Sequence, residues 1–410
     1  MQPCRHLNTF QTKHVPCIVN LKFPEHFAFG TSTSAYQIET PFEHDWADIR
    51  SRDGHIFNRT TDHERMVEED VKNIRFLAPH YRMGLMWSKL QREPMGDFDL
   101  SACTHYHYLL GRLRSKGVKI MMVLHHFANP LWFAKAGGWE SPSSIHIFVD
   151  FARKVVNEFG DYVTSWNTFN EPNLYAGMGW VAGEFPPFRK NPIVATKVLR
   201  NMAASHEQIY GIIKQRFPEH AVGISHNCAL FTAENFLGHV PARVLDWCYM
   251  EYPLSLFRSL DFFGMSYYAK IAHDPFPITT ISTPDKIKKT GRPHDDMWEY
   301  YPEGLRVCME RFWKQFKIPI IITENGICTS DDEKRVKALK DYLTIVHRAI
   351  EDGIRVEGYY HWSAWDNFEW HLGPTYRFGL FGVDRKTNTR FKKKSADVYS
   401  EIAHRGVLAV

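Results

Sequence analysis

The sequence lacks the features that would place the protein in a membrane, on a secretion route or on nucleic acid. No stretch approaches the roughly 18 apolar residues of a membrane-spanning helix, and segment 1–20 is polar, without the apolar centre of a signal peptide. The net charge is only +4 over 410 residues. A basic run near the C-terminus, Lys392-Lys393-Lys394, is interpreted as a solvated helix start rather than a nucleic-acid patch. We therefore expect a cytoplasmic protein with no nucleic-acid or membrane partner.

The sequence also lacks the motifs of metal and cofactor sites. Its seven cysteines are scattered without a Cys-x-x-Cys pair, which favours free thiols in a reducing compartment. No His-Glu-x-x-His spacing, P-loop or Gly-x-Ser-x-Gly turn is present. A loose Gly-x-Gly-x-x-Ala at 177–182 follows Asn-Glu-Pro instead of joining a strand directly to a helix. We expect no metal and no cofactor, which disfavours a nucleotide-dependent oxidoreductase.

Short apolar segments alternate with longer amphipathic ones along the whole chain. Several of the short segments are apolar nearly throughout, as parallel strands covered on both faces should be. The expected strands are 27–34, 81–87, 119–126, 163–170, 222–227, 262–268, 319–324 and 357–362. Among the helices, the clearest is expected to begin with a capping box of Ser330 and Glu333 and to end at Gly353.

Eight strand–helix pairs predict a single (β/α)8 TIM barrel, with a doubly wound sheet as the alternative. No linker rich in Pro, Gly or Ser divides the chain. We expect an N-terminal extension at 1–20 and one catalytic barrel at 21–410. In such barrels the active site lies at the carboxyl ends of the strands. Polar or aromatic residues do fall at or near those ends: Gln37, Arg82, His126, Asn170, Glu171, Tyr268, Glu324 and Trp362.

Two of these residues are carboxylates in distinctive surroundings. Glu171 lies between Asn170 and Pro172 in the segment WNTFNEP at 166–172, and Glu324 follows three isoleucines in IIITENG at 320–326. A carboxylate at the mouth of an apolar strand is partly desolvated, which costs free energy unless the group is paired or used. Either glutamate alone could be an ordinary loop acid. The two together indicate an acid/base or nucleophilic pair.

Four separated motifs resemble glycoside hydrolase family 1, the β-glucosidase family, over residues 22 to 403. FPEHFAFGTSTSAYQIE at 23–39 is similar to the family's N-terminal signature, TFNEP at 168–172 to its acid/base motif, and ITENG at 322–326 to its nucleophile motif. WSAWDNFEW at 362–370 with RFGL at 377–380 is similar to its sugar-binding segment. One departure is HHFA at 125–128, where many members have Tyr-His-Trp-Asp.

The resemblance implies a retaining mechanism that proceeds through a covalent glycosyl-enzyme. Glu324 would be the nucleophile, held ionised by Arg82 and a hydrogen bond from the Tyr268 hydroxyl. Glu171 would be the acid/base, and the nearby charge of Glu324 would raise its pKa. Asn170 beside it would bind the sugar 2-hydroxyl.

The resemblance also implies the substrate class. The sugar and its leaving group would be bound by Gln37, His126, Trp298, Trp362, Glu369, Trp370 and Phe378. Because Glu369 would repel a phosphate, we expect hydrolysis of terminal non-phosphorylated β-D-glucosides, and also of galactosides and fucosides, from small glycosides or oligosaccharides. Transfer of the sugar to an alcohol instead of water is a variant. A non-catalytic sugar-binding protein is the alternative, and a homo-oligomer is left open.

Overall fold

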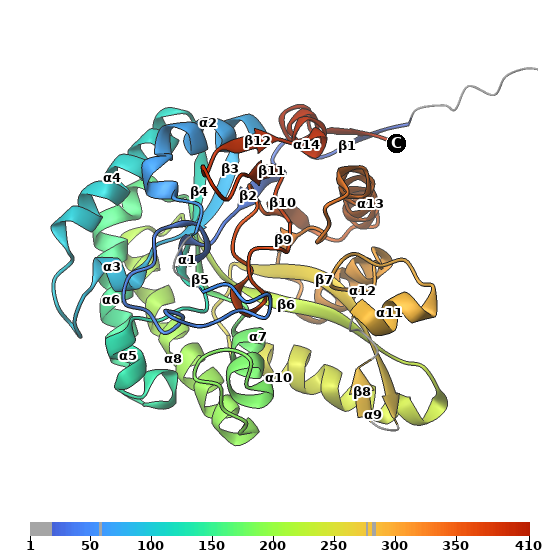
Figure 1. Ribbon diagram of the computed structural model, residues 1–410, viewed down its shortest axis with the longest axis horizontal. Helices are drawn as coiled ribbons and strands as arrows, with labels where there is room; N and C mark the ends of the chain where they lie inside the picture. The colour runs from blue at the N-terminus through green and yellow to red at the C-terminus, as the bar shows by residue number, and fades with distance from the viewer. Residues whose placement is uncertain (1–18, 57–59, 276–277, 281–283) are drawn as a thin grey trace, which may run out of the picture.

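The computed structural model describes residues 19–56, 60–275, 278–280 and 284–410. Eight parallel strands close into a barrel that is surrounded by helices (Figure 1). The order around the barrel is β6-β5-β4-β3-β2-β10-β9-β7, and the pairing of β6 with β7 closes it. The prediction of a (β/α)8 barrel is confirmed, and the doubly wound alternative is excluded because such a sheet stays open.

Each of the eight expected strands is present at its expected place. They are β2 (Ala28–Ser32), β3 (His80–Gly84), β4 (Lys119–His125), β5 (Ser165–Asn170), β6 (Ala221–Ala233), β7 (Phe262–Pro275), β9 (Ile320–Asn325) and β10 (Val356–Trp362). Two of them, β6 and β7, continue well beyond their expected ends and remain paired up to Ala233 and His273. Their extensions rise past the mouth of the barrel and form one wall of the site described below.

Helices follow the strands in the chain and cover the outer face of the barrel (Figure 1). The longer ones are α2 (Val67–Leu77), α4 (Leu100–Ser115), α6 (Ser144–Phe159), α8 (Pro192–Arg216), α12 (Glu303–Phe316), α13 (Asp332–Glu351) and α14 (Lys394–Arg405). The shorter ones are α1 (Ala35–Ile38), α3 (Trp87–Leu90), α5 (Leu131–Lys135), α7 (Pro172–Gly177), α9 (His239–Asp246), α10 (Tyr252–Ser255) and α11 (Pro284–Thr290). Short strands complete the fold: β1 (Asn20–Lys22), β8 (Ile278–Thr280), β11 (Phe381–Val383), β12 (Arg390–Lys392) and β13 (Val407–Ala409).

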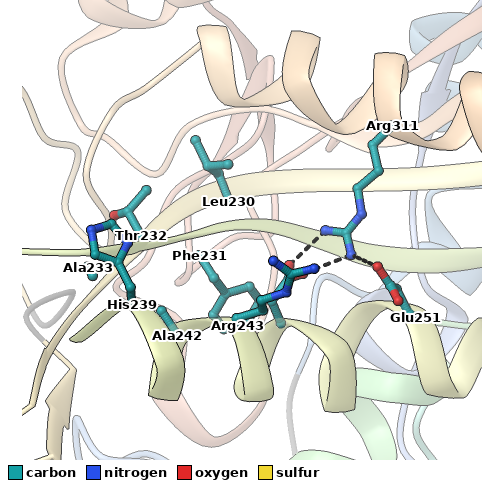
Figure 2. A pocket seen from close by; sticks show the side chains of 10 residues that line it. Leu230, Phe231, Thr232, Ala233, His239, Ala242, Arg243, Glu251 and Arg311 are labelled. Atoms are coloured by element: carbon teal, nitrogen blue, oxygen red, sulfur yellow. Dashed lines mark hydrogen bonds and ion pairs between the residues drawn. The ribbon is translucent and has the colours of Figure 1, made fainter. Parts of the chain in front are cut away.

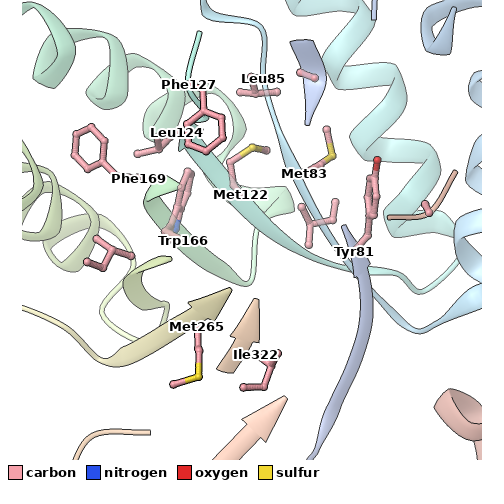
Figure 3. Close-up of a cluster of buried hydrophobic side chains, with 14 of the residues drawn as sticks. Tyr81, Met83, Leu85, Met122, Leu124, Phe127, Trp166, Phe169, Met265 and Ile322 are labelled. Atoms are coloured by element: carbon pink, nitrogen blue, oxygen red, sulfur yellow. The ribbon is translucent and has the colours of Figure 1, made fainter. Parts of the chain in front are cut away.

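Successive side chains along each barrel strand point alternately outward and inward, so the protein has one core under the helices and another inside the barrel. Side chains that point outward pack under the helices; Figure 3 shows several of them, including Tyr81 and Met83 on β3. Side chains that point inward fill the barrel. One group of these is apolar: Met121, Phe262, Ile321 and Tyr360, one each from β4, β7, β9 and β10. Arg82, between Tyr81 and Met83, belongs to the polar layer of the site, because it donates to Glu324.

Two local predictions were wrong. The cap of α13 is not Ser330, because the Asp331 carboxylate accepts hydrogen bonds from the backbone N–H groups of Glu333 and Lys334. A charged acceptor at the positive end of the helix dipole replaces the expected hydroxyl. The helix does end just before Gly353 with its positive φ, as expected: its last residue is Glu351 and its C-cap is Asp352.

The basic run at 392–394 is not solvated throughout. Lys392 and Lys394 are exposed, but the Lys393 side chain is only 12% exposed and its ammonium lies 2.9 Å from both oxygens of Asp366. It also donates to the backbone oxygen of Gly379 at 2.8 Å. Lys393 therefore anchors the segment 362–370 that was expected to bind sugar.

Most of the predicted N-terminal extension, residues 1–20, lies outside the described residues. Val19 exchanges two backbone hydrogen bonds with Val410, and Asn20 belongs to β1, which pairs with the C-terminal strand β13. The five described cysteines are free, and four of them are buried. No helix in the described ranges is long and apolar enough to span a membrane.

Candidate active site

The two predicted catalytic carboxyls line one cavity at the carboxyl ends of the barrel strands. Glu171 directly follows β5 and caps α7 with a left-handed backbone, φ +45°, while Glu324 lies near the end of β9. The cavity has a volume of about 370 Å³. Both glutamates are almost completely buried in the protein, with 3% and 4% of their surface exposed. Barrel closure thus unites two residues that are 153 positions apart in the sequence.

Arg82 is the centre of the polar layer beneath this cavity. Its guanidinium donates to the Glu324 carboxylate at 2.6 Å and to the Asn170 side-chain oxygen at 2.5 Å. Further bonds go to the hydroxyls of Ser32, at 2.9 Å, and Ser225, at 3.1 Å. Because Arg82 is fully buried, its charge requires such partners, and it in turn fixes the positions of the carboxylate and the amide.

Tyr268 holds the other oxygen of Glu324. Its hydroxyl donates to Oε2 of that carboxylate at 2.9 Å. The strand pairing explains why this side chain can reach inward. Cys228 on β6 is paired with Tyr267, but the next residue of β6, Ala229, is paired with Ala269, so that Tyr268 is an extra residue in β7. Such a bulge redirects side chains and is common beside active sites.

The two carboxyls have different electrostatic surroundings. Burial and then the negative charge of Glu324 raise the pKa of Glu171 to about 8, against a smaller lowering by the amide of Asn227. Burial also raises the pKa of Glu324, but there the Arg82 charge and the hydrogen bond from Tyr268 oppose it. The cation and its hydrogen bonds thus favour ionisation of Glu324 before Glu171. This order agrees with the expectation from the sequence.

Asn170 and His126 form a second arm of the network. The Asn170 amide nitrogen donates to Nε2 of His126 at 3.0 Å, which leaves the proton of this histidine on Nδ1. Burial lowers the pKa of His126 well below its usual value, so the ring is neutral. Its buried Nδ1 has no hydrogen-bond partner within the described protein. The ring lies in the cavity wall, where a sugar hydroxyl could accept from it.

Gln37 and Glu369 form another part of the site. The Gln37 amide donates to the Phe368 backbone oxygen at 2.9 Å and to the Asn367 side chain at 3.1 Å, and it lies 3.5 Å from Oε2 of Glu369. Its own side-chain oxygen is buried without a partner in the described protein. Burial, followed by the charge of Glu324, raises the pKa of Glu369 to about 8.

The four aromatic residues predicted to bind the sugar or its leaving group, Trp298, Trp362, Trp370 and Phe378, line the same cavity. His126 is stacked on Trp370 at a ring separation of 5.8 Å and lies at the same separation from Trp362. Trp298 lies 5.3 Å from Tyr268 and 6.2 Å from Phe378. Three predicted site residues do not line the cavity themselves but are hydrogen-bonded to residues that do. Gln37 contacts Glu369, Arg82 contacts Glu324, and Asn170 contacts His126.

Two polar residues beside Glu171, Asn227 and Tyr249, were not predicted from the sequence. Asn227 donates to Oε1 of Glu171 at 3.0 Å, and its own side-chain oxygen accepts from the Tyr249 hydroxyl at 2.7 Å. Asn227 ends the expected fifth strand, so its position at a barrel strand end could have indicated it. Tyr249 lies in a short π-helix at Trp247–Glu251, and no sequence signal connects it with the site.

A larger cavity of about 690 Å³ lies elsewhere, between α9, α12 and β6 (Figure 2). Its wall includes Arg311, which is paired with Asp246 at 2.8 Å and Glu251 at 2.5 Å. Neither predicted catalytic glutamate lines it. Among the described residues, no group of three or more His, Cys, Asp or Glu side chains is placed to hold a metal ion.

Comparison with known proteins identifies the family of this chain. The model of glycosyl hydrolase family 1 matches residues 19–235 and 253–407. "Beta-glucosidase A" of Acetivibrio thermocellus is 27% identical over 93% of this chain and 98% of its own length. A solved β-glycosidase from Pyrococcus horikoshii is 31% identical with a TM-score of 0.84, covering 95% of this chain and 96% of that one.

A further relative is named for a different reaction. The chloroplastic "Galactolipid galactosyltransferase SFR2" of Arabidopsis thaliana is 31% identical over 80% of this chain, although the match spans only 55% of that protein.

The family model leaves residues 236–252 unmatched, and Tyr249 lies within them.

Proposed function

Since the chain belongs to glycosyl hydrolase family 1 and is a β-glycosidase of that family, we propose that it cleaves terminal, non-phosphorylated β-D-glucosides with retention of configuration. Related galactosides and fucosides would be further substrates. Glu324 attacks the anomeric carbon while Glu171 donates its proton to the leaving oxygen. The bond between the anomeric carbon and that oxygen breaks. Glu171 then takes a proton from water, whose oxygen attacks the anomeric carbon and releases Glu324.

The observation that carries this proposal is the unequal surroundings of two carboxyls in one cavity. Glu324 has a cation at 2.6 Å and a hydroxyl donor at 2.9 Å, which suits an ionised nucleophile. Glu171 is hydrogen-bonded to the neutral amide of Asn227 rather than to a cation, and burial and the Glu324 charge raise its pKa to about 8, which suits an acid that is protonated at neutral pH. Once Glu324 is esterified its charge is gone, so Glu171 loses its proton more readily and can serve as the base.

Unphosphorylated sugars fit the charges of the cavity. Three carboxyls line it: Glu171, Glu324 and Glu369. Among the described residues that line the cavity, Arg52 is the one arginine, and its side chain is 59% exposed and already paired with Glu184. A phosphate on the sugar would therefore meet carboxyls rather than free cations. Aryl β-glucoside should be cleaved far faster than its 6-phosphate, measured as kcat/KM on the purified protein.

Azide rescue tests the two catalytic roles. Glu324→Gly should hydrolyse p-nitrophenyl β-glucoside at less than roughly 10⁻³ of the wild-type rate, since the nucleophile is lost. Added azide should restore release of nitrophenol and give the α-glucosyl azide. Glu171→Ala should instead give the β-azide, because Glu324 still forms the intermediate. Product configuration is read by proton NMR.

Glu43→Gly is the matched control for this experiment. Glu43 is exposed and has a backbone φ of +35°, which glycine adopts readily, so activity should stay at the wild-type level without azide. If azide rescued neither variant, or gave the same anomer with both, the assigned roles would be wrong. A wild-type protein that binds glucose analogues but cleaves no aryl glycoside would instead support the non-catalytic alternative.

Transfer to an alcohol is a second candidate reaction of the same intermediate. It is supported by the 31% identity to a galactosyltransferase and needs no additional residue, since Glu171 can deprotonate an alcohol as it does water. Hydrolysis in the presence of methanol distinguishes the two. A ratio of methyl glucoside to glucose that greatly exceeds the molar ratio of methanol to water would favour transfer.

A further inference from the structure

The side chains around Glu171 show what the leaving-group side of the cavity can bind. The leaving oxygen must contact this carboxyl, so the group attached to that oxygen lies beyond it. Leu174 follows Glu171 by three residues and Met178 by seven, a spacing that places all three on one face of the helical segment. Both side chains line the cavity and are partly exposed. They make the first wall of this side apolar.

The extensions of β6 and β7 make the second wall. Asn227, which contacts Glu171, and Ala229 lie two positions apart on β6 and so share one face. Across the sheet Ala229 is paired with Ala269, beyond the bulge at Tyr268, and Ile271 follows on the same face of β7. Ala229, Ala269 and Ile271 all line the cavity. Two small alanines side by side leave room there, and the isoleucine continues the apolar surface outward.

The polar groups in these two walls are already paired. The Asn227 amide donates to Glu171, its oxygen accepts from Tyr249, and its backbone N–H donates to the Asn173 side chain at 3.1 Å. The Tyr249 hydroxyl donates its proton in that bond. A second sugar ring would present several hydroxyls to these walls, and each one buried without a partner would cost free energy.

On the basis of the role proposed for Glu171, we propose that this side of the cavity binds an apolar aglycone, an alkyl or aryl group of several carbons, in preference to a second sugar. Leu174, Met178, Ala229, Ala269 and Ile271 form its binding surface. Met297 and Trp298 line the same cavity from the loop before α12, and the flexible methionine side chains can adapt to chains of different shape.

A series of straight-chain alkyl β-glucosides, from methyl to heptyl, tests this surface. All share one sugar and form one glucosyl-enzyme, so kcat/KM differs only through the aglycone. A fully buried methylene is worth up to about fourfold in kcat/KM. We expect an increase of about two- to fourfold per carbon over the first several carbons, followed by a plateau as the chain leaves the cavity. Cellobiose should be cleaved with at least roughly tenfold lower kcat/KM than the best alkyl glucoside.

A pair of isoleucine substitutions localises the effect. Ile271→Thr exchanges part of the apolar wall for a hydroxyl and should reduce the gain from methyl to heptyl by about tenfold. Ile193→Thr is the matched control; Ile193 is 82% exposed on α8, and it should keep the wild-type chain-length dependence. Glucosides are used below their critical micelle concentrations, so that only monomers are compared. Far-ultraviolet circular dichroism checks that both variants are folded.

The outcomes separate this proposal from the proposed function. Cleavage of methyl and aryl glucosides with no gain along the alkyl series, or with cellobiose preferred, would overturn the apolar aglycone and leave the β-glucosidase activity standing. An equal loss of chain-length dependence in both isoleucine variants would also overturn it. No cleavage of any glucoside, while glucose analogues still bind, would overturn the proposed function itself.

Discussion

Replacing Tyr268 by phenylalanine tests the electrostatic basis of the proposed mechanism. The substitution removes one oxygen atom and leaves the ring in place between Trp298 and Phe378. The lost group is the hydroxyl that donates to Oε2 of Glu324 at 2.9 Å. This bond stabilises the ionised carboxylate, so its removal raises the pKa of Glu324 further.

The expected size follows from the type of bond. A hydrogen bond to a charged group contributes about 1.5–3 kcal/mol, and one pKa unit corresponds to about 1.4 kcal/mol. The pKa of Glu324 should therefore rise by about one to two units. Because the nucleophile must be ionised, the acidic limb of the pH dependence of kcat/KM should move to higher pH by the same amount. The alkaline limb, governed by Glu171, should move little, so the active range narrows.

The assay is kcat/KM for p-nitrophenyl β-glucoside measured from pH 4 to pH 10. The two limbs belong to a coupled pair, so both are fitted together for wild type and variant. Tyr210→Phe is the matched control, since the Tyr210 hydroxyl also donates to a carboxylate at 2.9 Å, that of Asp261, outside the cavity. An acidic limb that stays in place in Tyr268→Phe, or that moves equally in Tyr210→Phe, would refute the reasoning.

Two stability predictions follow from other buried charges. Lys393→Met leaves the buried carboxylate of Asp366 without the Lys393 cation and should lower the free energy of unfolding by about 3–5 kcal/mol. The control Lys394→Met changes an exposed neighbour and should alter the free energy of unfolding by less than about 0.5 kcal/mol. Urea unfolding measures both. For Glu171, a pKa of about 8 in the folded state lies above the ordinary value of 4.5, so the wild type loses stability as pH rises between these values, by at most about 1.4 kcal/mol per pH unit. Glu171→Gln should remove this loss and therefore raise the melting temperature more at pH 8 than at pH 5; an equal gain at both pH values would contradict the assignment.

Much of the fold and of the site could be predicted from local sequence. Parallel strands covered on both faces are apolar along their length, so the segments at 119–126 and 319–324 are recognisable without any contact information. The acids Glu171 and Glu324 could be identified because Glu171 directly follows an expected strand and Glu324 is the last residue of another. The strand ends also indicated His126 and Tyr268, since barrel strands direct their ends to one face, whereas Arg82 was expected within the second strand.

Local pattern was less reliable where neighbouring residues compete. Ser330 and Asp331 are both good helix caps, and the sequence favours the first because Glu333 follows it at the capping-box distance. In the fold Asp331 takes the position, since its carboxylate accepts from two backbone N–H groups at once. Which of the two residues becomes the N-cap depends on the position at which the preceding loop brings the backbone to the start of the helix.

Only the tertiary structure decided which groups meet. Lys393 reads as one of three solvated lysines until the fold places Asp366 beside it, 27 residues away in sequence. The bond from Tyr249 to Asn227 depends on a short helix packing against β6, and the bulge at Tyr268 depends on the register of β6 and β7. Hydrophobic periodicity is a property of one segment and can therefore be recognised from the sequence alone. The partner of a buried charge or amide is fixed by strand register and barrel closure, which arise only when distant segments pack together.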